Sequence, residues 1–309
     1  MVDATLREDT ALELLRRREL IAVLEALGAA SVRPLVFKGA ALAHTHYPIP
    51  AARPHLDVDL MVEEPAVEAA DRVLTQLGYH RPLRISGTLI KSQATYLKED
   101  AYGVLHTMDL HWKVSIPQVF ADLFSFDELA SSSVPLPAAG ASARAVGRVH
   151  ALAIACVHRV AHHPGDDRPI WLHDIHLLAS GLSEAEIREF IGLIERKAIT
   201  HVCRDGILRA QRQFDTKLPE GLADELERVA AACLREPSAA YLRPGLRPIG
   251  GLVSDLSALP TWRQRARLVR EHLLPPASYM QQTYGTTARA MLPLLYAWRA
   301  MKGAGRWFS

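Results

Sequence analysis

The hydrophobic pattern of this chain changes once, near residue 117, and this change constrains the fold more than any other feature. Before it, short apolar runs with the two-residue period of strands are mixed with helical segments. After it come only long helical patterns, which cover residues 143–163, 169–180, 184–214, 219–235, 260–274 and 287–301. We therefore expect an α+β first domain over residues 1–130, a Ser- and Pro-containing linker over 131–137, and a helical second domain over 138–309.

The first domain is predicted to begin with a helix over residues 8–28, which Gly28 closes. A short apolar strand at 34–37 then meets the turn Lys38-Gly39 and enters a helix. A second strand covers 56–62, and a helix covers 65–77. Further strands are expected at 85–90, 94–97 and 104–112, as an antiparallel extension.

Three acidic residues fall on predicted strands. In the alternating run 56–62, Asp57 and Asp59 share one face, and Asp109 lies on one face of the strand 104–112 together with Thr107 and His111. An Asp-x-Asp pair alone is more often solvent-facing than functional. However, two or three carboxylates on rigid strands are enough to hold Mg²⁺, whose charge assists phosphoryl-type transfer. The hypothesis is a metal site at Asp57, Asp59 and Asp109, with Asp109 also acting as general base.

A phosphate-binding turn is predicted just upstream. The backbone N–H groups at Lys38-Gly39 and the positive end of the following helix favour an anion. Lys38 and Arg53 could add charge-assisted contacts to triphosphate oxygens, although both would equally serve as ordinary surface cations.

These motifs together resemble the large, mostly uncharacterised bacterial nucleotidyltransferase family of the polymerase-β superfamily. The resemblance covers roughly residues 30 to 300 and rests on an ordered set of short runs. These are Val36-Phe-Lys-Gly-Ala-Ala-Leu42, Tyr47-Pro48, Arg53, Asp57-Val-Asp-Leu-Met-Val62, Gly78-Tyr79, Asp109-Leu-His-Trp112, His158-Arg-Val-Ala-His162, Ile170 to Leu178, Arg270 to Pro276, Tyr279-Met280 and Tyr284-Gly285.

The resemblance implies a nucleotidyltransferase domain, a mixed sheet with flanking helices, packed against a helical domain. It implies that Asp57 and Asp59 bind metal, that Asp109 is the third catalytic acid, and that Lys38-Gly39 is the phosphate-side turn. Two Mg²⁺ ions, with Mn²⁺ as an alternative, and a nucleoside triphosphate (NTP) would then be required. The acceptor could be a small molecule, a peptide, a protein or an RNA end. One departure is Gly39-Ala40, where related enzymes usually have Gly-Ser.

The histidines allow two interpretations. His158 and His162 have the four-residue spacing of metal ligands, with His163, His173 and His176 nearby. No Cys or second His pair has standard zinc spacing, so we expect a different role. The preferred hypothesis is that His158, His162 and Asp174 line the cleft that faces the nucleotide or acceptor.

Composition excludes several classes of protein. The net charge of +2 gives no electrostatic case for dedicated DNA binding, and Arg263, Arg265, Arg267 and Arg270 are expected on a solvated helix face. Three scattered cysteines, Cys156, Cys203 and Cys233, indicate a reduced, cytoplasmic protein. No apolar run reaches the ~18 residues that span a bilayer, so no membrane association is expected.

Two other functions stay open at this point. Ala40 in place of serine is compatible with a nucleotide-binding regulator that has lost catalysis. The same acids could also support phosphotransfer, in which a nucleoside diphosphate leaves in place of pyrophosphate.

Overall fold

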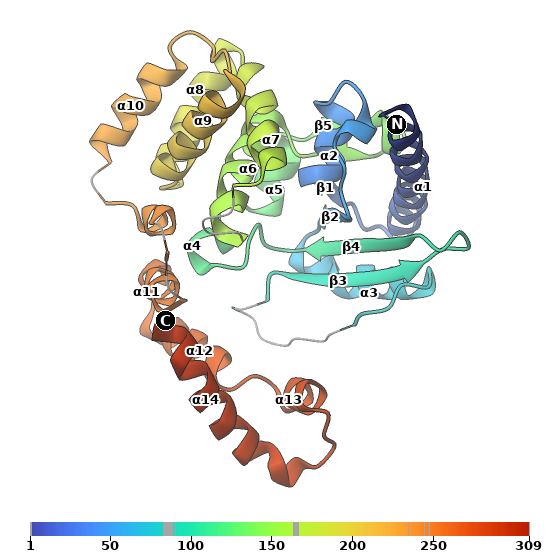
Figure 1. Ribbon diagram of the computed structural model, residues 1–309, viewed down its shortest axis with the longest axis vertical. Coiled ribbons are helices and arrows are strands. Elements are labelled where there is room, and N and C mark those ends of the chain that lie inside the picture. The colour runs from blue at the N-terminus through green and yellow to red at the C-terminus, as the bar shows by residue number, and fades with distance from the viewer. Residues whose placement is uncertain are drawn as a thin grey trace.

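A mixed six-stranded sheet forms one part of the protein, and a set of helices forms the other (Figure 1). The computed structural model describes residues 2–82, 89, 91–162, 167–233, 235–243, 245–246 and 248–308. The strand expected at 85–90 lies, apart from residue 89, outside the described residues. The expected α+β class, with a mixed sheet and a C-terminal helical region, is confirmed.

The strands lie in the order β3-β4-β2-β1-β6-β5. Their bounds are β1 Leu35–Phe37, β2 Asp57–Met61, β3 Gln93–Glu99, β4 Leu105–His111, β5 Val134–Pro135 and β6 Arg144–Ala145. The antiparallel extension was correctly predicted for β3 and β4, but β4 pairs in parallel with β2. β1 is antiparallel to β2 and parallel to β6, while β5 and β6 pair antiparallel. The parallel pairing of β2 and β4 places the two strands that carry Asp57, Asp59 and Asp109 side by side.

Helices cover one face of the sheet. The helices in this part of the chain are α1 Val2–Ala29, α2 Lys38–Thr45, η1 Pro50–Ala52, η2 Glu64–Ala66, α3 Val67–Gln76, α4 Gln118–Ala121, α5 Phe126–Ser131 and η3 Pro137–Ala139. Of these, α1 and α3 pack on this face, whereas α4 and α5 contribute Phe120 and Leu129 to the core on the other face. Leu27 of α1 and Leu74 of α3 are fully buried against Val58 and Leu60 of β2. Burial of this apolar surface therefore fixes which face of β2 turns inward and leaves the alternate residues on the opposite face.

The opposite face of the sheet shares a second core with the helical region. Phe37 of β1 and Met61 of β2 belong to the same buried cluster as residues of the later helices. These helices are α6 Arg148–His162, α7 Pro169–Ser180, α8 Glu184–Arg196, α9 Thr200–Phe214, α10 Leu222–Ala232, η4 Pro237–Leu242, α11 Pro248–Ala258, α12 Trp262–Leu273, α13 Ala277–Tyr284, η5 Arg289–Met291 and α14 Leu292–Phe308. The acidic residues of β2 and β4 therefore lie at the junction of the two parts.

Three predicted segments differ from the structure. The stretch 131–137, expected as a linker, contains β5, and β6 shortens the helix expected at 143–163. The helical pattern 184–214 is interrupted because Ala198 adopts a left-handed φ of 52°, which ends α8 and starts α9. Since the sheet extends through β6, we propose that the first domain ends after residue 145 instead of at 130.

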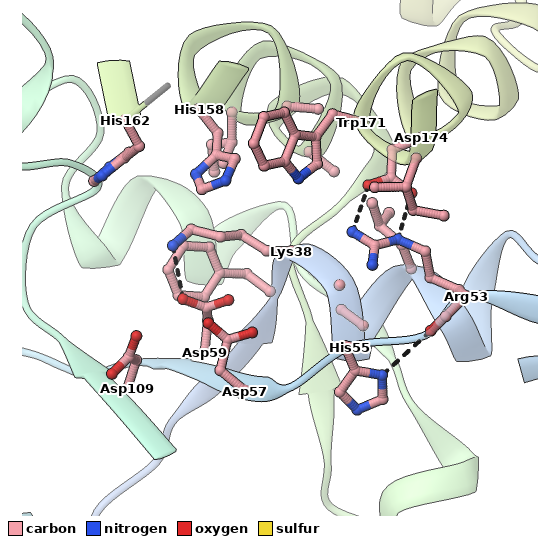
Figure 2. A pocket seen from close by; sticks show the side chains of 18 of the residues that line it. Lys38, Arg53, His55, Asp57, Asp59, Asp109, His158, His162, Trp171 and Asp174 are labelled. Atoms are coloured by element: carbon pink, nitrogen blue, oxygen red, sulfur yellow. Dashed lines mark hydrogen bonds and ion pairs between the residues drawn. The ribbon is translucent and has the colours of Figure 1, made fainter. Parts of the chain in front are cut away.

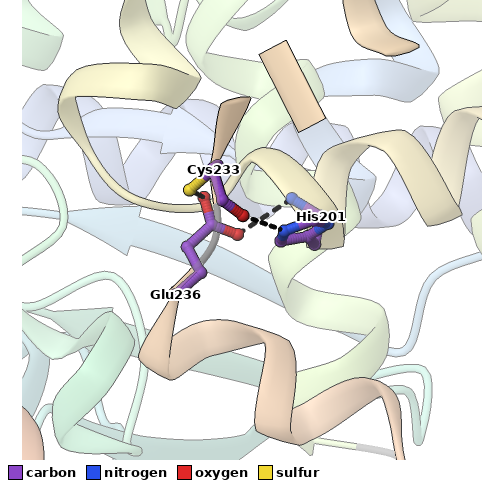
Figure 3. A group of neighbouring side chains, drawn as sticks. All are labelled: His201, Cys233 and Glu236. Carbon is purple, nitrogen blue, oxygen red and sulfur yellow. Dashed lines mark hydrogen bonds between the residues drawn. The ribbon is translucent and has the colours of Figure 1, made fainter. Parts of the chain in front are cut away.

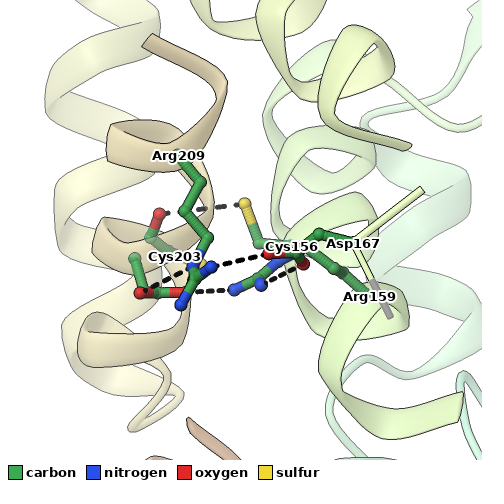
Figure 4. A network of polar contacts seen from close by, with 6 residues as sticks. Cys156, Arg159, Asp167, Cys203 and Arg209 are labelled. Atoms are coloured by element: carbon green, nitrogen blue, oxygen red, sulfur yellow. Dashed lines mark hydrogen bonds and ion pairs between the residues drawn. The ribbon is translucent and has the colours of Figure 1, made fainter. Parts of the chain in front are cut away.

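A buried cation ties α6 to α9 within the helical region (Figure 4). Arg159 of α6 donates to Asp167 at 2.6 Å and to Asp205 of α9. Arg209 of α9 donates to Asp167 at 2.7 Å and to Asp205 at 2.9 Å. Two carboxylates thus balance the charges of two guanidinium groups. Their attraction offsets the cost of removing the charge of Arg159 from water.

Several expectations from composition can be compared with the structure. Cys156 and Cys203 are buried as expected, whereas Cys233 is partly exposed. The arginines of α12 are exposed and its Leu268 is buried, as an amphipathic surface helix requires. None of the helices among the described residues combines the length and apolar character needed to cross a membrane.

Candidate active site

The carboxylates of Asp57, Asp59 and Asp109 lie on one face of the sheet, on two neighbouring strands (Figure 2). Asp59 is directly opposite Asp109 in the parallel pair β2 and β4. Because side chains alternate between faces, the three acids point away from Val58, which packs beneath α1 and α3. The structure thus brings together the three acids that the sequence places on two separate strands.

Asp59 is the most enclosed of the three. Its Oδ1 accepts a hydrogen bond from Lys38 Nζ at 2.6 Å and lies 2.8 Å from His111 Nε2. Burial opposes ionisation of Asp59, but Lys38 and His111 outweigh it and hold the pKa of this carboxyl well below its usual range. Burial and the charge of Lys38 lower the pKa of His111. We therefore assign His111 as a neutral imidazole that donates Nε2–H to an ionised Asp59.

Strand β3 orients Asp109. Thr95 Oγ1 donates to Asp109 Oδ1 at 2.6 Å, and Gln93 Nε2 donates to Oδ2 at 3.1 Å. Both donors are neutral, so they orient the carboxylate of Asp109 without cancelling a charge on it.

Asp57 experiences the accumulated negative charge. Burial first, and then repulsion from Asp59 and Asp109, raises its pKa to about 6. The ligand atoms of Asp59, Asp109 and His111 also lie within 4.8 Å of one another. A site where carboxylates repel one another in this way gains electrostatic stabilisation from a bound cation, and its oxygen-rich donor set suits Mg²⁺.

The turn between β1 and α2 carries backbone strain. Lys38 adopts a left-handed φ of 55°, which costs a residue with a side chain on the order of 1–3 kcal/mol. A Cβ placed on Gly39 would lie 3.3 Å from Arg53 Nη1 and 3.3 Å from His55 Cβ. A methyl group at 39 would therefore crowd Arg53 and His55. The conformation of Lys38 lets the chain enter α2 directly with the ammonium beside Asp59.

Arg53 and Asp174 join the two parts of the protein through a buried ion pair. Arg53 Nε and Nη2 donate to the two oxygens of Asp174, each at 2.8 Å, and Nη1 donates to the Pro54 carbonyl at 2.7 Å. Tyr47 also donates its hydroxyl to Asp174 at 2.8 Å. Arg53 and Asp174 both line the cavity, but these hydrogen-bonding groups already have protein partners.

The acids form part of the floor of a cavity of about 460 Å³, and α6 and α7 supply its opposite wall. His158, His162 and Trp171 face the acids across this space (Figure 2). His158 meets Trp171 edge to face with ring centroids 5.5 Å apart, and Arg168 lies 5.0 Å from the Trp171 ring centre. The wall therefore offers aromatic surface and positive charge.

His173 and His176 are not among the residues that line this cavity. His173 contacts the Tyr47 hydroxyl at 3.0 Å, and His176 contacts Thr216 Oγ1 at 2.8 Å. His163 lies outside the described residues. In the described part of the chain, no group of three potential metal ligands includes His158 or His162, whose rings lie 5.0 Å apart.

Some site residues were missed from the sequence. His111 was placed on the same strand face as Asp109, so the signal existed, but no role was assigned to it. Gln93 and Thr95 gave no signal, because their contact with Asp109 depends on how β3 pairs with β4. Trp171 also lines the cavity, and no site role was assigned to it from the sequence.

Comparison with known proteins gives one family and two structures. The model of a family described as uncharacterised nucleotidyltransferase matches residues 4–215. No curated protein matches this chain. A solution structure of the antibiotic-resistance factor ANT(2'')-Ia is similar at 16% identity and a TM-score of 0.40, covering 62% of this chain and 95% of that one. The crystal structure of JHP933 from Helicobacter pylori is similar at 12% identity and a TM-score of 0.35, covering 71% and 90% of the two chains.

Proposed function

The chain belongs to the family of uncharacterised nucleotidyltransferases, and we propose that it transfers a nucleoside monophosphate from an NTP to an acceptor hydroxyl. The observation that carries this proposal is the convergence of Asp57, Asp59 and Asp109 beside the turn at Lys38 and Gly39. Convergence of all three acids also favours a working enzyme over a regulator that only binds nucleotide.

Asp57, Asp59 and Asp109 are the residues we propose to hold Mg²⁺. The mutual repulsion that raises the pKa of Asp57 supports this assignment, because a cation would relieve it. When bound, divalent ions supply charge neutralisation at the triphosphate. The ligand atom of His111 lies within 4.8 Å of those of Asp59 and Asp109, and we propose that His111 orients Asp59 through their 2.8 Å hydrogen bond.

In the proposed reaction the acceptor oxygen attacks the α-phosphorus. A bond forms between this oxygen and phosphorus, the bond to the bridging oxygen breaks, and pyrophosphate leaves. Asp109 takes the acceptor proton, since Gln93 and Thr95 hold its carboxylate in one orientation. Lys38 and the backbone at Gly39 bind the phosphate groups. No protein group changes its oxidation state.

The cavity wall is proposed to select the organic parts of the substrates. His158, His162 and Trp171 would contact the base or the acceptor, because their rings face the acids across the cavity. Arg53 and Asp174 are better explained as positioning residues, since their hydrogen bonds fix the segment that precedes Asp57 against α7.

Labelled nucleotides test this proposal. The purified protein is incubated with Mg²⁺ and each NTP labelled at the α- or the γ-phosphate, with fractionated metabolites, peptides, proteins and RNA as acceptors. Transfer of the α-label with release of pyrophosphate is expected. Asp59→Asn and Asp109→Asn should abolish it, whereas Asp122→Asn, at an exposed carboxylate, should not.

Each other outcome points elsewhere. Transfer of the γ-label would identify a phosphotransferase. NTP binding without transfer to any fraction would support a regulator. Full transfer by both Asp59→Asn and Asp109→Asn would show that the chemistry takes place at another site.

A further inference from the structure

Three side chains with metal-binding chemistry meet in the helical region, away from the carboxylates of the sheet (Figure 3). His201 lies in the first turn of α9, Cys233 follows the end of α10, and Glu236 precedes η4. One potential ligand atom from each lies within 4.8 Å of the other two. Their spacing along the chain matches no standard zinc motif, so only the packing of these elements brings them together.

The donor set and its dimensions suit zinc. Imidazole nitrogen, thiolate sulfur and carboxylate oxygen are the three common protein ligands of Zn²⁺. Bond lengths of ~2.3 Å to sulfur and ~2.0 Å to oxygen place these two atoms ~3.5 Å apart in a tetrahedral site. Cys233 Sγ lies 3.5 Å from Glu236 Oε1. The sulfur and oxygen therefore already have the separation that a shared zinc ion requires.

Backbone hydrogen bonds hold two of the ligands in orientation. Glu236 Oε1 accepts from Thr200 N at 2.6 Å, and Oε2 accepts from His201 N at 2.9 Å. His201 Nε2 lies 2.9 Å from the carbonyl oxygen of Cys233, which can only accept, so Nε2 carries a proton. In the neutral ring Nδ1 then keeps its lone pair. Metal-bound histidines and carboxylates typically have such outer hydrogen bonds.

We propose that the imidazole of His201, the Cys233 thiolate and the Glu236 carboxylate form a zinc site with a fourth position open to water. Cys233 and His201 are only partly buried, so an ion can enter from solvent. Binding releases the thiol proton to solvent and leaves all oxidation states unchanged. The N-terminal end of α9 carries roughly half a positive charge, which repels a cation. The thiolate and the carboxylate together supply two negative charges, which outweigh this repulsion.

This site would tie the end of α10 to the start of α9 and stabilise the helical region. It is independent of the proposed nucleotidyl transfer, which uses oxygen ligands on the sheet. The competing interpretation is that Glu236 only caps α9 and that Cys233 donates S–H to it. That arrangement needs no metal and contains the same contacts, so the two interpretations differ in whether a thiolate binds an ion.

Cobalt substitution distinguishes the two. The full-length protein, stripped of metal with a chelator, is titrated with Co²⁺ in the presence of excess Mg²⁺ to occupy the carboxylates of the sheet. We expect a thiolate-to-cobalt charge-transfer band that saturates at one equivalent, with visible bands typical of four-coordinate cobalt. Addition of one equivalent of Zn²⁺ should abolish the spectrum and raise the midpoint of thermal unfolding.

Variants assign the band to a residue. Cys233→Ser should lose the charge-transfer band and the zinc-dependent rise in unfolding temperature, and His201→Gln should weaken cobalt binding at least tenfold. Cys156→Ala, at a cysteine outside the cluster, should retain both signals. Absence of the band from the wild-type protein, or an equal band in Cys233→Ser, would overturn the proposal.

Discussion

Arg53 and Asp174, 121 residues apart in the sequence, form a two-bonded ion pair in which both side chains are almost fully buried. The pair connects the segment before β2 to α7, and Tyr47 completes it. Removal of one partner from a buried pair leaves an uncompensated charge, which costs far more than the pair contributes as a whole.

Asp174→Ala should therefore destabilise the protein by about 3–5 kcal/mol. Tyr47→Phe removes the hydrogen bonds of the hydroxyl to Asp174 and His173 and should cost about 1–2 kcal/mol. The double variant Arg53→Met with Asp174→Leu should recover most of the loss, because it removes both charges. Urea denaturation measures each change in the free energy of unfolding. The slope of this free energy against urea concentration should be the same in all variants. An Asp174→Ala loss no larger than that of Tyr47→Phe would contradict the prediction.

Gly39→Ala tests the close packing at the phosphate-side turn. The added methyl group would lie 3.3 Å from Arg53 Nη1, so either the turn or the guanidinium must shift. We expect nucleotidyl transfer to fall by roughly 10- to 100-fold with little loss of stability, because small displacements of aligned groups are costly for catalysis.

Gly28→Ala is the matched control for this substitution. A Cβ at Gly28 meets no atom within 4 Å, and the residue lies in helix α1. This variant should keep full activity and gain up to about 1 kcal/mol of stability. Equal activity of the two variants would show that packing at Gly39 is unimportant.

Asp57 is expected to destabilise the metal-free protein at neutral pH. Its pKa in the folded state is about 6, above the ordinary value of 3.8. Folding thus favours the protonated carboxyl, and the resulting stabilisation is complete below about pH 4 and is lost as the pH rises through 6. In Mg²⁺-free buffer Asp57→Asn should therefore be more stable than the wild type at pH 8, by on the order of 1–2 kcal/mol, and not at pH 4.

Thermal unfolding across this pH range measures the effect. Mg²⁺ at pH 8 should stabilise the wild type more than Asp57→Asn, because a bound cation relieves the repulsion among the acids. Asp122→Asn, at an exposed carboxylate, should show no such dependence. A stability difference for Asp57→Asn that stays constant from pH 4 to about 8 would refute the assignment.

His111 is predicted to orient Asp59 for metal binding. His111→Leu removes the donor to Asp59 Oδ1 and should weaken Mg²⁺ binding by roughly 10- to 100-fold. His111→Gln keeps a donor at the end of the side chain and should lose less. Isothermal titration with Mg²⁺ and an NTP analogue measures the affinity. His106→Leu, on the other face of the same strand, should bind Mg²⁺ normally, and a His111→Leu protein that did so too would rule out this role.

Local patterns predicted many individual elements. The helix expected at 169–180 coincides with α7, Pro169–Ser180, because its apolar spacing begins at a proline and ends before Gly181. The alternation at 56–62 placed Asp57 and Asp59 on one face, since the side-chain period of a strand depends only on the backbone. The split of 184–214 was not visible, because the left-handed conformation at Ala198 carries no glycine signal.

Contacts between distant segments could not be predicted in this way. Arg53 looked like a triphosphate ligand because a lone arginine near an acidic strand has no visible partner, and Asp174 looked like a cleft residue for the same reason. The stretch 131–137 looked like a linker because two-residue strands such as β5 are too short for any periodicity. The ligands proposed for zinc have no spacing signal, since α9, α10 and η4 meet only in the folded protein.

The sequence by itself determined the identity and facing of the acids, the order of the strands and helices that surround them, and the family to which the chain belongs. These depend on local backbone periodicity and on side-chain chemistry, which need no knowledge of the fold. Only the tertiary structure decided that β4 lies parallel to β2 with Asp109 opposite Asp59, that Arg53 is paired with Asp174, and that His111 supports Asp59. The physical reason is that burial and hydrogen bonding are satisfied between segments far apart in the chain, and the choice among such partners is made by packing of the whole molecule.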